Sequence, residues 1–408
     1  MDTLDHCRAC LAPAPYLFLP LGMHAPAQML VRPDDMDKPQ PSFPLNTQVC
    51  LTCGLIQVAD QIPADFFRHY LYVPSGAATM HSHFADFAKV LADRAGDGLI
   101  VDIGSNDGIL LADCNKLGCR TLGVDPAENI AELARSRCVE VYLAYFDPDT
   151  AEALRASRGP ARVIVTTNTF NHIGDLHRFM KGVDILLADD GVFVIEVPRA
   201  KEMIEKGAFD NIYHEHVSEF SLLSVAKLGE YFDLEVTDAL RLPAIHGGSM
   251  RIFLTRRTAG VTPSPVVQDM LKEEQAIGML DRQTYDAFAQ RVASLGVDLK
   301  AKLDDLKAQG LKIAGYGASA RGNTVLTHFG IDTKYLDFLV DKNSLKHGLY
   351  SPNTRIPIRP VEAIKQEKPD VLFMLAWNFF DEIREQQAGF EAVGGRFLMP
   401  FPTPAFAP

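Results

Sequence analysis

Four consecutive residues, Tyr213-His214-Glu215-His216, combine side chains that commonly transfer protons in enzymes. Such a group is costly to bury and unusual in a loop, so a catalytic role is favoured over ordinary packing. His216 has the acidity of a proton carrier near neutral pH. Glu215 would orient it or stabilise its charge, and Tyr213 would donate a hydrogen bond to an oxygen that becomes negative. The zinc-protease motif HExxH is excluded, because position 218 is serine.

A further histidine follows the strand-like stretch VIVTTN, at the end of the run from Asn168 to His172. Ligands bind at the carboxyl ends of strands in open α/β sheets, so we expect His172 to face the substrate. Tyr70 and Tyr72 lie earlier, before the first α/β elements. These two tyrosines would either close over a cofactor or serve as packing residues, and both alternatives stay open.

A nucleotide-type turn follows the strand-like stretch GLIVDIGS and precedes a helix. Its glycines permit a tight bend and a close approach of the ligand to the backbone, but the turn lacks the dinucleotide pattern GxGxxG. An acidic residue there would repel a pyrophosphate and suits a ligand with a ribose and a cationic amino-acid tail, as in S-adenosylmethionine. Asp125 ends the next strand, where it would accept hydrogen bonds from ribose hydroxyls, and Phe146 would flank the adenine. The expected cofactor residues are Asp102, Gly104, Asn106, Asp107, Gly108, Asp125, Phe146 and Asn168.

A second glycine-rich loop, GYGASARGN, follows a strand near the C-terminus. Free backbone N–H groups, a helix N-terminus and an arginine predict a phosphate site. Taken alone, the loop fits a nicotinamide dehydrogenase, and a nucleotide-sugar diphosphate is the competing occupant. The expected ligand-binding residues are Gly315, Gly317, Ser319, Arg321, Gly322 and Asn323.

Four of the seven cysteines form two Cys-x-x-Cys pairs, Cys7 with Cys10 and Cys50 with Cys53. Two such turns suit tetrahedral Zn2+, and four sulfur ligands would fill its coordination shell. We therefore predict a structural zinc site and not a catalytic one.

These residues imply three segments. Residues 1–62 contain the proline-rich stretches APAPYLFLP and KPQPSFPL, which break long helices and central strands, so this segment needs the metal to hold it together. Residues 63–240 alternate strand-like runs with helical stretches, which predicts an open sheet of parallel strands. Residues 241–408 open with the strand-like MRIFLTRR, continue with a helical stretch at about 265–309 and end in a second α/β series. The fold class is α/β, with a crevice between two nucleotide-type domains.

The composition excludes several classes of protein. The formal net charge of −12 argues against a nucleic-acid binder, which needs a basic surface. No apolar run reaches the length of a membrane span, and the N-terminus lacks the layout of a secretion signal. We expect a cytoplasmic protein with no membrane partner, a monomer or small homo-oligomer.

Taken together, the motifs resemble the sugar C-methyltransferase family. The resemblance covers nearly the whole chain and is carried, in order, by the paired cysteines, VDIGSNDG, NTFNH, NIYHEH, HGGSMR, GYGASARGN and LAWNF. It implies an N-terminal zinc module, a central class I S-adenosylmethionine-dependent methyltransferase domain and a C-terminal Rossmann-like domain that helps to hold a nucleotide-sugar.

In that family the last histidine of YHEH is the suspected base, which here is His216, and a tyrosine before the methyltransferase domain corresponds to Tyr70 or Tyr72. The resemblance implies that a base-generated enolate of a nucleotide-linked keto-sugar attacks the donor methyl. NTFNH and the YVPSGAATM stretch depart from the usual pattern near the expected sugar, so they bear on the sugar's identity. The alternatives are an oxidoreductase that uses the 315–322 loop and an O- or N-methyltransferase of another small molecule.

Overall fold

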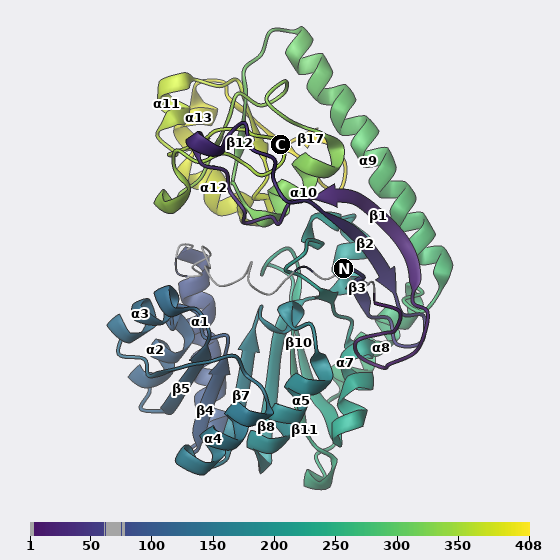
Figure 1. The fold of residues 1–408 in the computed structure, drawn as a ribbon, viewed down its shortest axis with the longest axis vertical. Coiled ribbons are helices and arrows are strands. Elements are labelled where there is room, and N and C mark those ends of the chain that lie inside the picture. The colour runs from purple at the N-terminus through teal and green to yellow at the C-terminus, as the bar shows by residue number, and fades with distance from the viewer. Residues whose placement is uncertain (1–3, 61, 63–74, 76–77) are drawn as a thin grey trace.

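The computed structural model describes residues 4–60, 62, 75 and 78–408. Its strands form three sheets, of four, seven and six strands. The largest sheet lies in the lower half of Figure 1, the six-stranded sheet lies in the upper half, and the four-stranded sheet joins them along one side. No helix in the described ranges is both long enough and apolar enough to cross a membrane.

The N-terminal segment folds as an antiparallel sheet in the order β1-β2-β3-β9. Its strands are β1 (Tyr16–His24), β2 (Phe43–Val49), β3 (Ile56–Val58) and β9 (Ser218–Glu219). The prolines are expected to break long helices and central strands, and Pro20 lies inside an edge strand, β1, next to a bulge in its pairing with β2. Because β1 is an edge strand, a proline costs it little. The last strand, β9, comes from the middle of the chain.

The central sheet has the order β10-β11-β8-β7-β4-β5-β6. Its first five strands in the chain are parallel, as predicted, and β11 runs antiparallel between β8 and β10. The strands are β4 (Leu99–Ile103), β5 (Arg120–Asp125), β6 (Val141–Leu143), β7 (Ala161–Thr167), β8 (Leu187–Pro198), β10 (Leu234–Leu242) and β11 (Ser249–Arg256). The strand order reverses at β4, which is where α/β sheets bind ligands.

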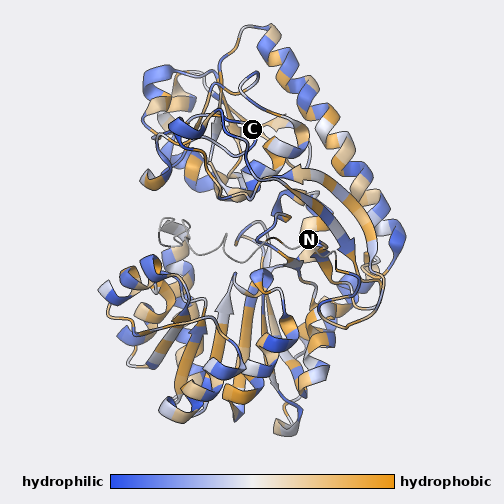
Figure 2. Ribbon diagram, viewed as in Figure 1, coloured by the Kyte–Doolittle hydropathy of each residue, from blue (hydrophilic) through white to orange (hydrophobic). Residues whose placement is uncertain are grey.

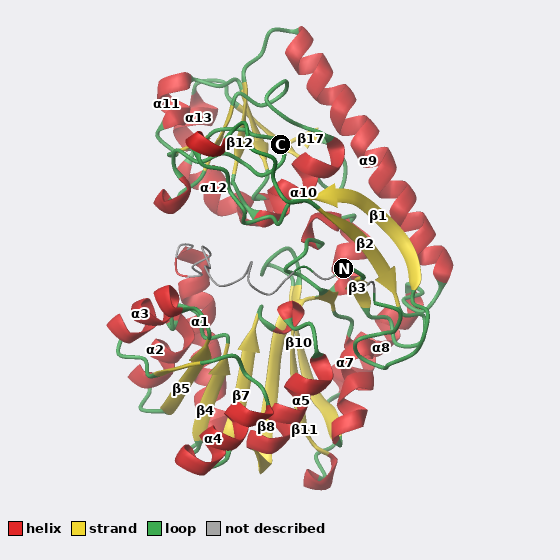
Figure 3. Ribbon diagram, in the orientation of Figure 1, coloured by secondary structure: helices red, strands yellow, loops and turns green. Residues whose placement is uncertain are grey.

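Helices cover both faces of this sheet (Figure 3). They are α1 (Ala78–Ala95), α2 (Ile109–Lys116), α3 (Glu128–Ser136), α4 (Pro148–Arg158), α5 (Leu176–Leu186), α6 (Ala200–Lys206) and α7 (Leu222–Gly229), with the short 3-10 helices η4 (Phe170–His172) and η5 (Phe209–Asn211). Ser221 caps α7 by accepting a hydrogen bond from Ser224 N–H.

The boundary expected between residues 240 and 241 cuts through β10 and is corrected by the sheet pairing. The strand predicted to open the third segment is β11, which pairs with β8 and β10 in the central sheet. Residues 241–256 therefore complete the central domain. A strand's own residues do not reveal which sheet it joins, because the pairing is set by contacts with distant strands.

The C-terminal sheet has the order β14-β13-β12-β15-β16-β17, and all its pairs are parallel except the last. The strands are β12 (Ile313–Tyr316), β13 (Phe338–Val340), β14 (Ile358–Arg359), β15 (Val371–Met374), β16 (Arg396–Met399) and β17 (Ala405–Phe406). The helices are α10 (Ala320–Phe329), α11 (Ala363–Glu367), α12 (Phe380–Gln386) and α13 (Ala388–Ala392).

Two helices lead from the central to the C-terminal domain, where one stretch was expected. They are α8 (Pro265–Ala276) and α9 (Arg282–Ala308), and Gly278 in the positive-φ region separates them. Figure 1 shows α9 along the outside of the molecule, beside β1. The helix and the N-terminal sheet therefore form one wall that joins the two α/β domains.

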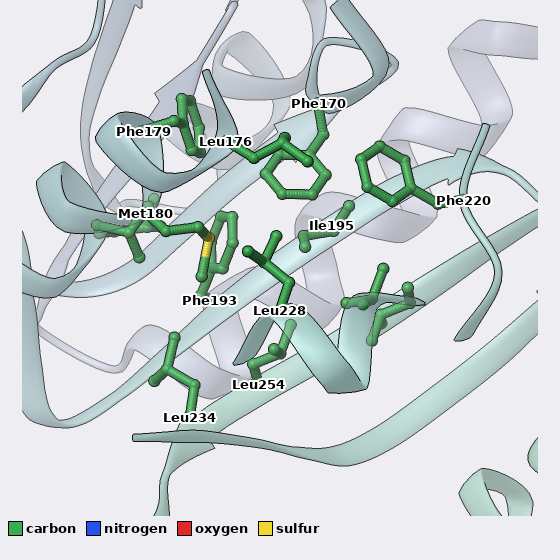
Figure 4. Packing of buried hydrophobic residues seen from close by; sticks show 14 of the residues in the cluster. Phe170, Leu176, Phe179, Met180, Phe193, Ile195, Phe220, Leu228, Leu234 and Leu254 are labelled. Carbon is green, nitrogen blue, oxygen red and sulfur yellow. The ribbon is translucent and has the colours of Figure 1, made fainter. Parts of the chain in front are cut away.

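The strands of the central sheet are mostly apolar, whereas the outer helices alternate between polar and apolar residues (Figure 2). Under α5 and α7 the core is aromatic and aliphatic, and Figure 4 shows Phe170, Phe193 and Phe220 packed together. The Phe170 and Phe220 rings stack with centroids 4.8 Å apart. This contact ties the loop after β7 to the segment that follows Tyr213–His216.

Candidate active site

A cavity of about 1030 Å³ lies between the central and C-terminal domains, as the predicted crevice requires. Loops after β4, β5, β7 and β8 line one side, and loops after β12, β13 and β15 line the other. Gln28 of the N-terminal segment also reaches it. The volume is at the upper end of the range for small-ligand sites, so the cavity has room for two ligands.

The turn after β4 is shaped for a ligand that presses against its backbone. Gly104 has φ +74°, and a Cβ there would lie 2.2 Å from Oγ1 of Thr169. Asn106 is also in the left-handed region, and its backbone N–H donates to a carboxylate oxygen of Asp125 over 3.0 Å. The N–H of Ala127 donates to the other oxygen over 2.9 Å. Asp125 is thereby fixed at the cavity wall, in position to meet a pair of hydroxyl groups.

Asp102 lies deeper in the same part of the cavity and is almost fully buried. One of its carboxyl oxygens has no hydrogen-bond partner among the described residues. Burial, and then the charge of Asp125, raise the pKa of Asp102 to about 8. An unpaired carboxyl in such a place calls for a cationic partner. The ammonium and sulfonium groups of S-adenosylmethionine meet that need, and its ribose suits Asp125, so these residues fit the cofactor.

Phe146 and Asn168 line the cavity with this group, but Asp107 and Gly108 are not among its lining residues. Asp107 is fully buried beneath the turn and forms an ion pair with Arg137, with 2.9 Å between Oδ2 and Nη1. Gly108 is the N-cap of α2. The expectation that they contact the ligand is therefore corrected, because in this tight turn the side chain after Asn106 points to the protein side. Asp102, also one of the expected cofactor residues, is the buried acid of this region that lines the cavity.

Substitution of Gly104 tests the shape of the turn. We expect Gly104→Ala to weaken binding of S-adenosylmethionine by at least about tenfold, because the new Cβ must displace Thr169 from the cavity wall. Gly118→Ala is the matched control, since Gly118 has a similar φ of +83° and open space around it. Both variants pay the cost of a positive φ, about 1–2 kcal/mol, which thermal unfolding measures. Equal cofactor affinities of the two variants by titration calorimetry would contradict this assignment.

The residues expected to do chemistry come together on the cavity wall, from the loop after β7 and from the segment between η5 and β9. The rings of His172 and His216 are perpendicular, with centroids 5.0 Å apart. Tyr213 packs on His216 with a centroid distance of 4.0 Å, and its hydroxyl is hydrogen-bonded to Nε2 of that imidazole. These three residues and Glu215 all line the cavity. Tyr72, the remaining predicted catalytic residue, lies outside the described residues.

The electrostatics of the cluster favour uncharged side chains. Burial, and then the neighbouring His216, lower the pKa of His172 to about 3. Burial, and then the Arg321 cation, lower the pKa of His216 to about 3. Both imidazoles are therefore neutral near neutral pH, and a neutral imidazole can accept a proton.

Glu215 has the opposite shift. Burial raises the pKa of its carboxyl to about 8, and Oε2 has no hydrogen-bond partner in the described part of the chain. At neutral pH this group therefore keeps much of its proton. A protonated carboxyl beside the histidines can donate a hydrogen bond to an oxygen that gains negative charge.

On the C-terminal side, Gly317, Ser319 and Arg321 line the cavity as predicted. The guanidinium of Arg321 is already engaged: two of its nitrogens donate to the carboxylate of Asp210, each over 2.9 Å. Trp377 Nε1 donates to the same carboxylate over 2.8 Å. Arg321 thus links the C-terminal domain to the central domain, and its expected contact with a phosphate stays a prediction.

Gly315, Gly322 and Asn323 are absent from the cavity lining, so their expected ligand contacts are also corrected. A Cβ at Gly315 or Gly322 would press on Leu339 or Leu375, so both glycines serve strand and helix packing. Asn323 faces the N-terminal segment, and its Nδ2 donates to the carbonyl of Ala27 over 2.8 Å.

Several polar residues of this wall were not predicted as a site. Lys342 and Lys346 line the cavity after β13 beside Asp341, which accepts from Ala318 N–H over 2.9 Å and from Lys346 Nζ over 3.1 Å. The sequence feature that could have indicated these residues is the run Asp-Lys-Asn at 341–343, which directly follows a strand. His246, in the glycine-rich turn between β10 and β11, lines the cavity too, and burial lowers its pKa to about 4.

The cysteine prediction is confirmed. The sulfur atoms of Cys7, Cys10, Cys50 and Cys53 lie within 4.8 Å of one another, and all four residues are buried. Four thiolates at this spacing fit tetrahedral zinc and leave no ligand position open for a substrate.

Comparisons with known families also divide the chain into three parts, although their second boundary lies before β11 and not after it. Residues 7–67 match a zinc binding domain, residues 77–239 match a methyltransferase domain, and residues 244–402 match a C-methyltransferase C-terminal domain.

Individual proteins are similar over the whole chain or over part of it. C-methyltransferase NovU of Streptomyces niveus is 35% identical over 405 residues, which are 98% of this chain and 96% of that protein. Among solved structures, the CcbJ methyltransferase of Streptomyces caelestis is 13% identical with a TM-score of 0.36, over 48% of this chain and 96% of that one. A S-adenosylmethionine-dependent methyltransferase of Clostridium acetobutylicum is 16% identical with a TM-score of 0.35, over 43% and 92% of the two chains.

Proposed function

Because this chain belongs to the S-adenosylmethionine-dependent C-methyltransferases, a family shown by its full-length similarity to NovU, we propose that it methylates a carbon next to the ketone of a nucleotide-linked keto-sugar. The observation that carries the proposal is one cavity that brings three groups of residues together. The group around Asp102 and Asp125 suits the methyl donor, the histidine cluster suits the reacting carbon, and the loops after β12 and β13 suit a second nucleotide.

The central cluster suits a carbon acid. A carbon next to a ketone loses a proton only when a base takes it and the oxygen that becomes negative is stabilised. We assign the base to His216, whose imidazole lines the cavity beside His172 and Tyr213 and is neutral near neutral pH. His172, Tyr213 and the protonated carboxyl of Glu215 are the candidates to hold the enolate oxygen. Methylation of an oxygen or nitrogen would not require this combination.

S-adenosylmethionine, when bound, supplies an electrophilic methyl group. The residues of this chain have to hold the substrate carbon in line with that methyl and to keep water out. The Gly104 turn and Asp125 would hold the donor, and the cluster that includes His216 would hold the reacting end of the sugar. Correct placement of two reactants contributes several orders of magnitude in rate.

The C-terminal wall suits the nucleotide diphosphate. Lys342 and Lys346 line it, where they pair with Glu382 over 3.0 Å and with Asp341 over 3.1 Å, and Gly317 brings the backbone close to the cavity. A nicotinamide oxidoreductase is not proposed, because residues 244–402 match the C-terminal domain of C-methyltransferases.

A solvent-exchange experiment tests this function. The enzyme is incubated in heavy water with a panel of nucleotide-linked 4-keto sugars, first without a methyl donor. We expect deuterium to enter one ring carbon of the true substrate, because the base can act before methyl transfer. Addition of S-adenosylmethionine should then place the methyl on the same carbon, as mass spectrometry and NMR will show. Failure of every keto-sugar to exchange and to accept a methyl would refute the proposal.

A further inference from the structure

Behind the histidine cluster lies a buried glutamate that the reaction described above does not use. Oε1 of Glu219 lies 3.4 Å from Nδ1 of His216. The opposite ring nitrogen, Nε2, faces the hydroxyl of Tyr213. Glu219 is only 2% exposed and is not among the cavity-lining residues. The imidazole therefore stands between the cavity and this carboxyl group.

We propose that Glu219 is a positioning residue: its carboxylate keeps Nδ1 of His216 protonated, so that Nε2 is the basic nitrogen, and stabilises the imidazolium formed on proton transfer. This role rests on the proposed function, in which His216 is the base. It adds a residue that neither the sequence motifs nor the cavity lining indicated.

The local contacts do not explain why a carboxyl group is present. Glu219 Oε1 has no hydrogen-bond partner among the described residues, and Oε2 receives one long hydrogen bond, 3.4 Å, from Asn211 Nδ2. The nearby cation, Arg321, is held by Asp210 through two hydrogen bonds. A buried carboxyl group with so few partners lowers the stability of the fold. A positive charge that develops on His216 during the reaction would supply the missing partner of this carboxylate.

The position of Glu219 is set by the N-terminal sheet. It lies in β9, where it pairs with Ile56 of β3, and Ser218 pairs with Gln57. The N–H of Val58 donates to the carbonyl of Val217 over 3.0 Å. Because the strand fixes the backbone, the carboxyl group cannot move far from the imidazole.

The proton passes from the substrate carbon to His216 without any further reactant. The substrate C–H bond breaks, its electron pair stays on the carbon as part of the enolate, and the proton forms an N–H bond at Nε2 of His216 once the ketone substrate has displaced the Tyr213 hydroxyl. The ring then carries a positive charge, and its Nδ1–H faces the Glu219 carboxylate. The carboxylate is ionised before and after the step, so it stabilises the product of proton transfer more than the reactant.

The charged and titratable groups around Glu219 and His216 set the pKa of the Glu219 carboxyl group. Burial raises the pKa of Glu219 well above its ordinary value, Arg321 of α10 opposes this shift and Asp210 of η5 adds to it. His216 is also faced by His172 of η4, by the backbone of Asn211 and by the more distant His246. The working form has Glu219 deprotonated, so activity should rise as the pH rises through this raised pKa.

The test compares Glu219→Gln with the wild-type enzyme and with Glu230→Gln, an exposed glutamate paired with Lys227. We expect kcat for Glu219→Gln to fall on the order of 10²-fold. Its affinity for S-adenosylmethionine should be unchanged, and the acid limb of its pH profile should disappear. NMR of the histidine ring nitrogens, with His216→Gln for assignment, should show His216 reporting the Glu219 titration in wild type and not in Glu219→Gln. Glu230→Gln should match wild type throughout.

The NMR result needs no substrate, so it separates the two proposals. If His216 senses the same titration in Glu219→Gln as in wild type, the pairing is refuted. If the titration depends on Glu219 but wild type exchanges no keto-sugar proton, the pairing stands and the proposed function fails. A Glu219→Gln enzyme with normal kcat and an unchanged acid limb would refute the role in catalysis.

Discussion

Replacement of His216 by alanine is expected to lower turnover by about 10³-fold and to abolish deuterium exchange into the keto-sugar, while S-adenosylmethionine binds with nearly normal affinity. The loss follows from the removal of the proposed base, whose pKa of about 3 keeps it neutral. The cofactor is unaffected because the Gly104 turn and Asp125 belong to other loops of the cavity. Deuterium exchange into the keto-sugar is measured by NMR of samples quenched at successive times. The affinity for S-adenosylmethionine is measured separately by titration calorimetry.

His216→Gln is the matched control for this variant. A glutamine can keep a hydrogen bond to Tyr213, but its amide cannot accept the substrate proton. If His216 acts only by holding Tyr213 in place, the glutamine should restore much of the activity. We expect it to remain as inactive as His216→Ala. Near-normal turnover of either variant would mean that another group, with Tyr213 the nearest candidate, removes the proton.

Removal of the zinc is expected to have an effect of similar size, although the metal site is not part of the cavity. The N-terminal segment holds the catalytic segment through several contacts. Arg8 Nη1 donates to the carbonyls of Val58 and Val217, over 2.8 and 3.0 Å. Ser221 Oγ donates to the carbonyl of Gly54, next to Cys53, over 3.3 Å. Loss of the metal should loosen these anchors and misplace the catalytic histidine.

A chelator or the substitution Cys53→Ser should therefore abolish turnover while S-adenosylmethionine still binds, because the turn after β4 belongs to the central sheet. Hydrogen exchange followed by mass spectrometry should show faster exchange in residues 213–221 and little change in β4. Cys138→Ser is the control, since Cys138 is exposed and lies outside the cluster. It should retain metal and activity. Full turnover by zinc-free enzyme would contradict the structural dependence.

Much of the site could be predicted from short motifs, because their geometry is local. A Cys-x-x-Cys turn directs two sulfurs to one point whatever surrounds it, which is why the cluster of Cys7, Cys10, Cys50 and Cys53 was predicted. A strand followed by a glycine turn and a helix brings Gly104 and the next strand end, Asp125, to the same edge of a sheet. The prediction that the crevice lies between two α/β domains follows from the same rule.

The predictions that failed depend on side-chain direction and on partners far along the chain. Asp107 and Asn106 are neighbours in the turn, yet only Asn106 lines the cavity, because Asp107 is paired with Arg137 below it. β11, the strand expected to open the third segment, pairs with β8 and β10 of the central sheet, and a strand's own residues do not reveal which sheet it joins.

The sequence by itself determined the chemistry that this chain carries: four thiolates, a cofactor turn and a set of proton-transferring side chains, each specified within a few residues. The tertiary structure decided how they are used. Arg321 is bound to Asp210, 111 positions away, and so joins two domains. Glu219 lies behind His216 because it pairs in β9 with Ile56 of β3, 163 positions earlier in the chain. Such pairings depend on which surfaces pack together across the whole chain, and short-range sequence patterns do not contain that information.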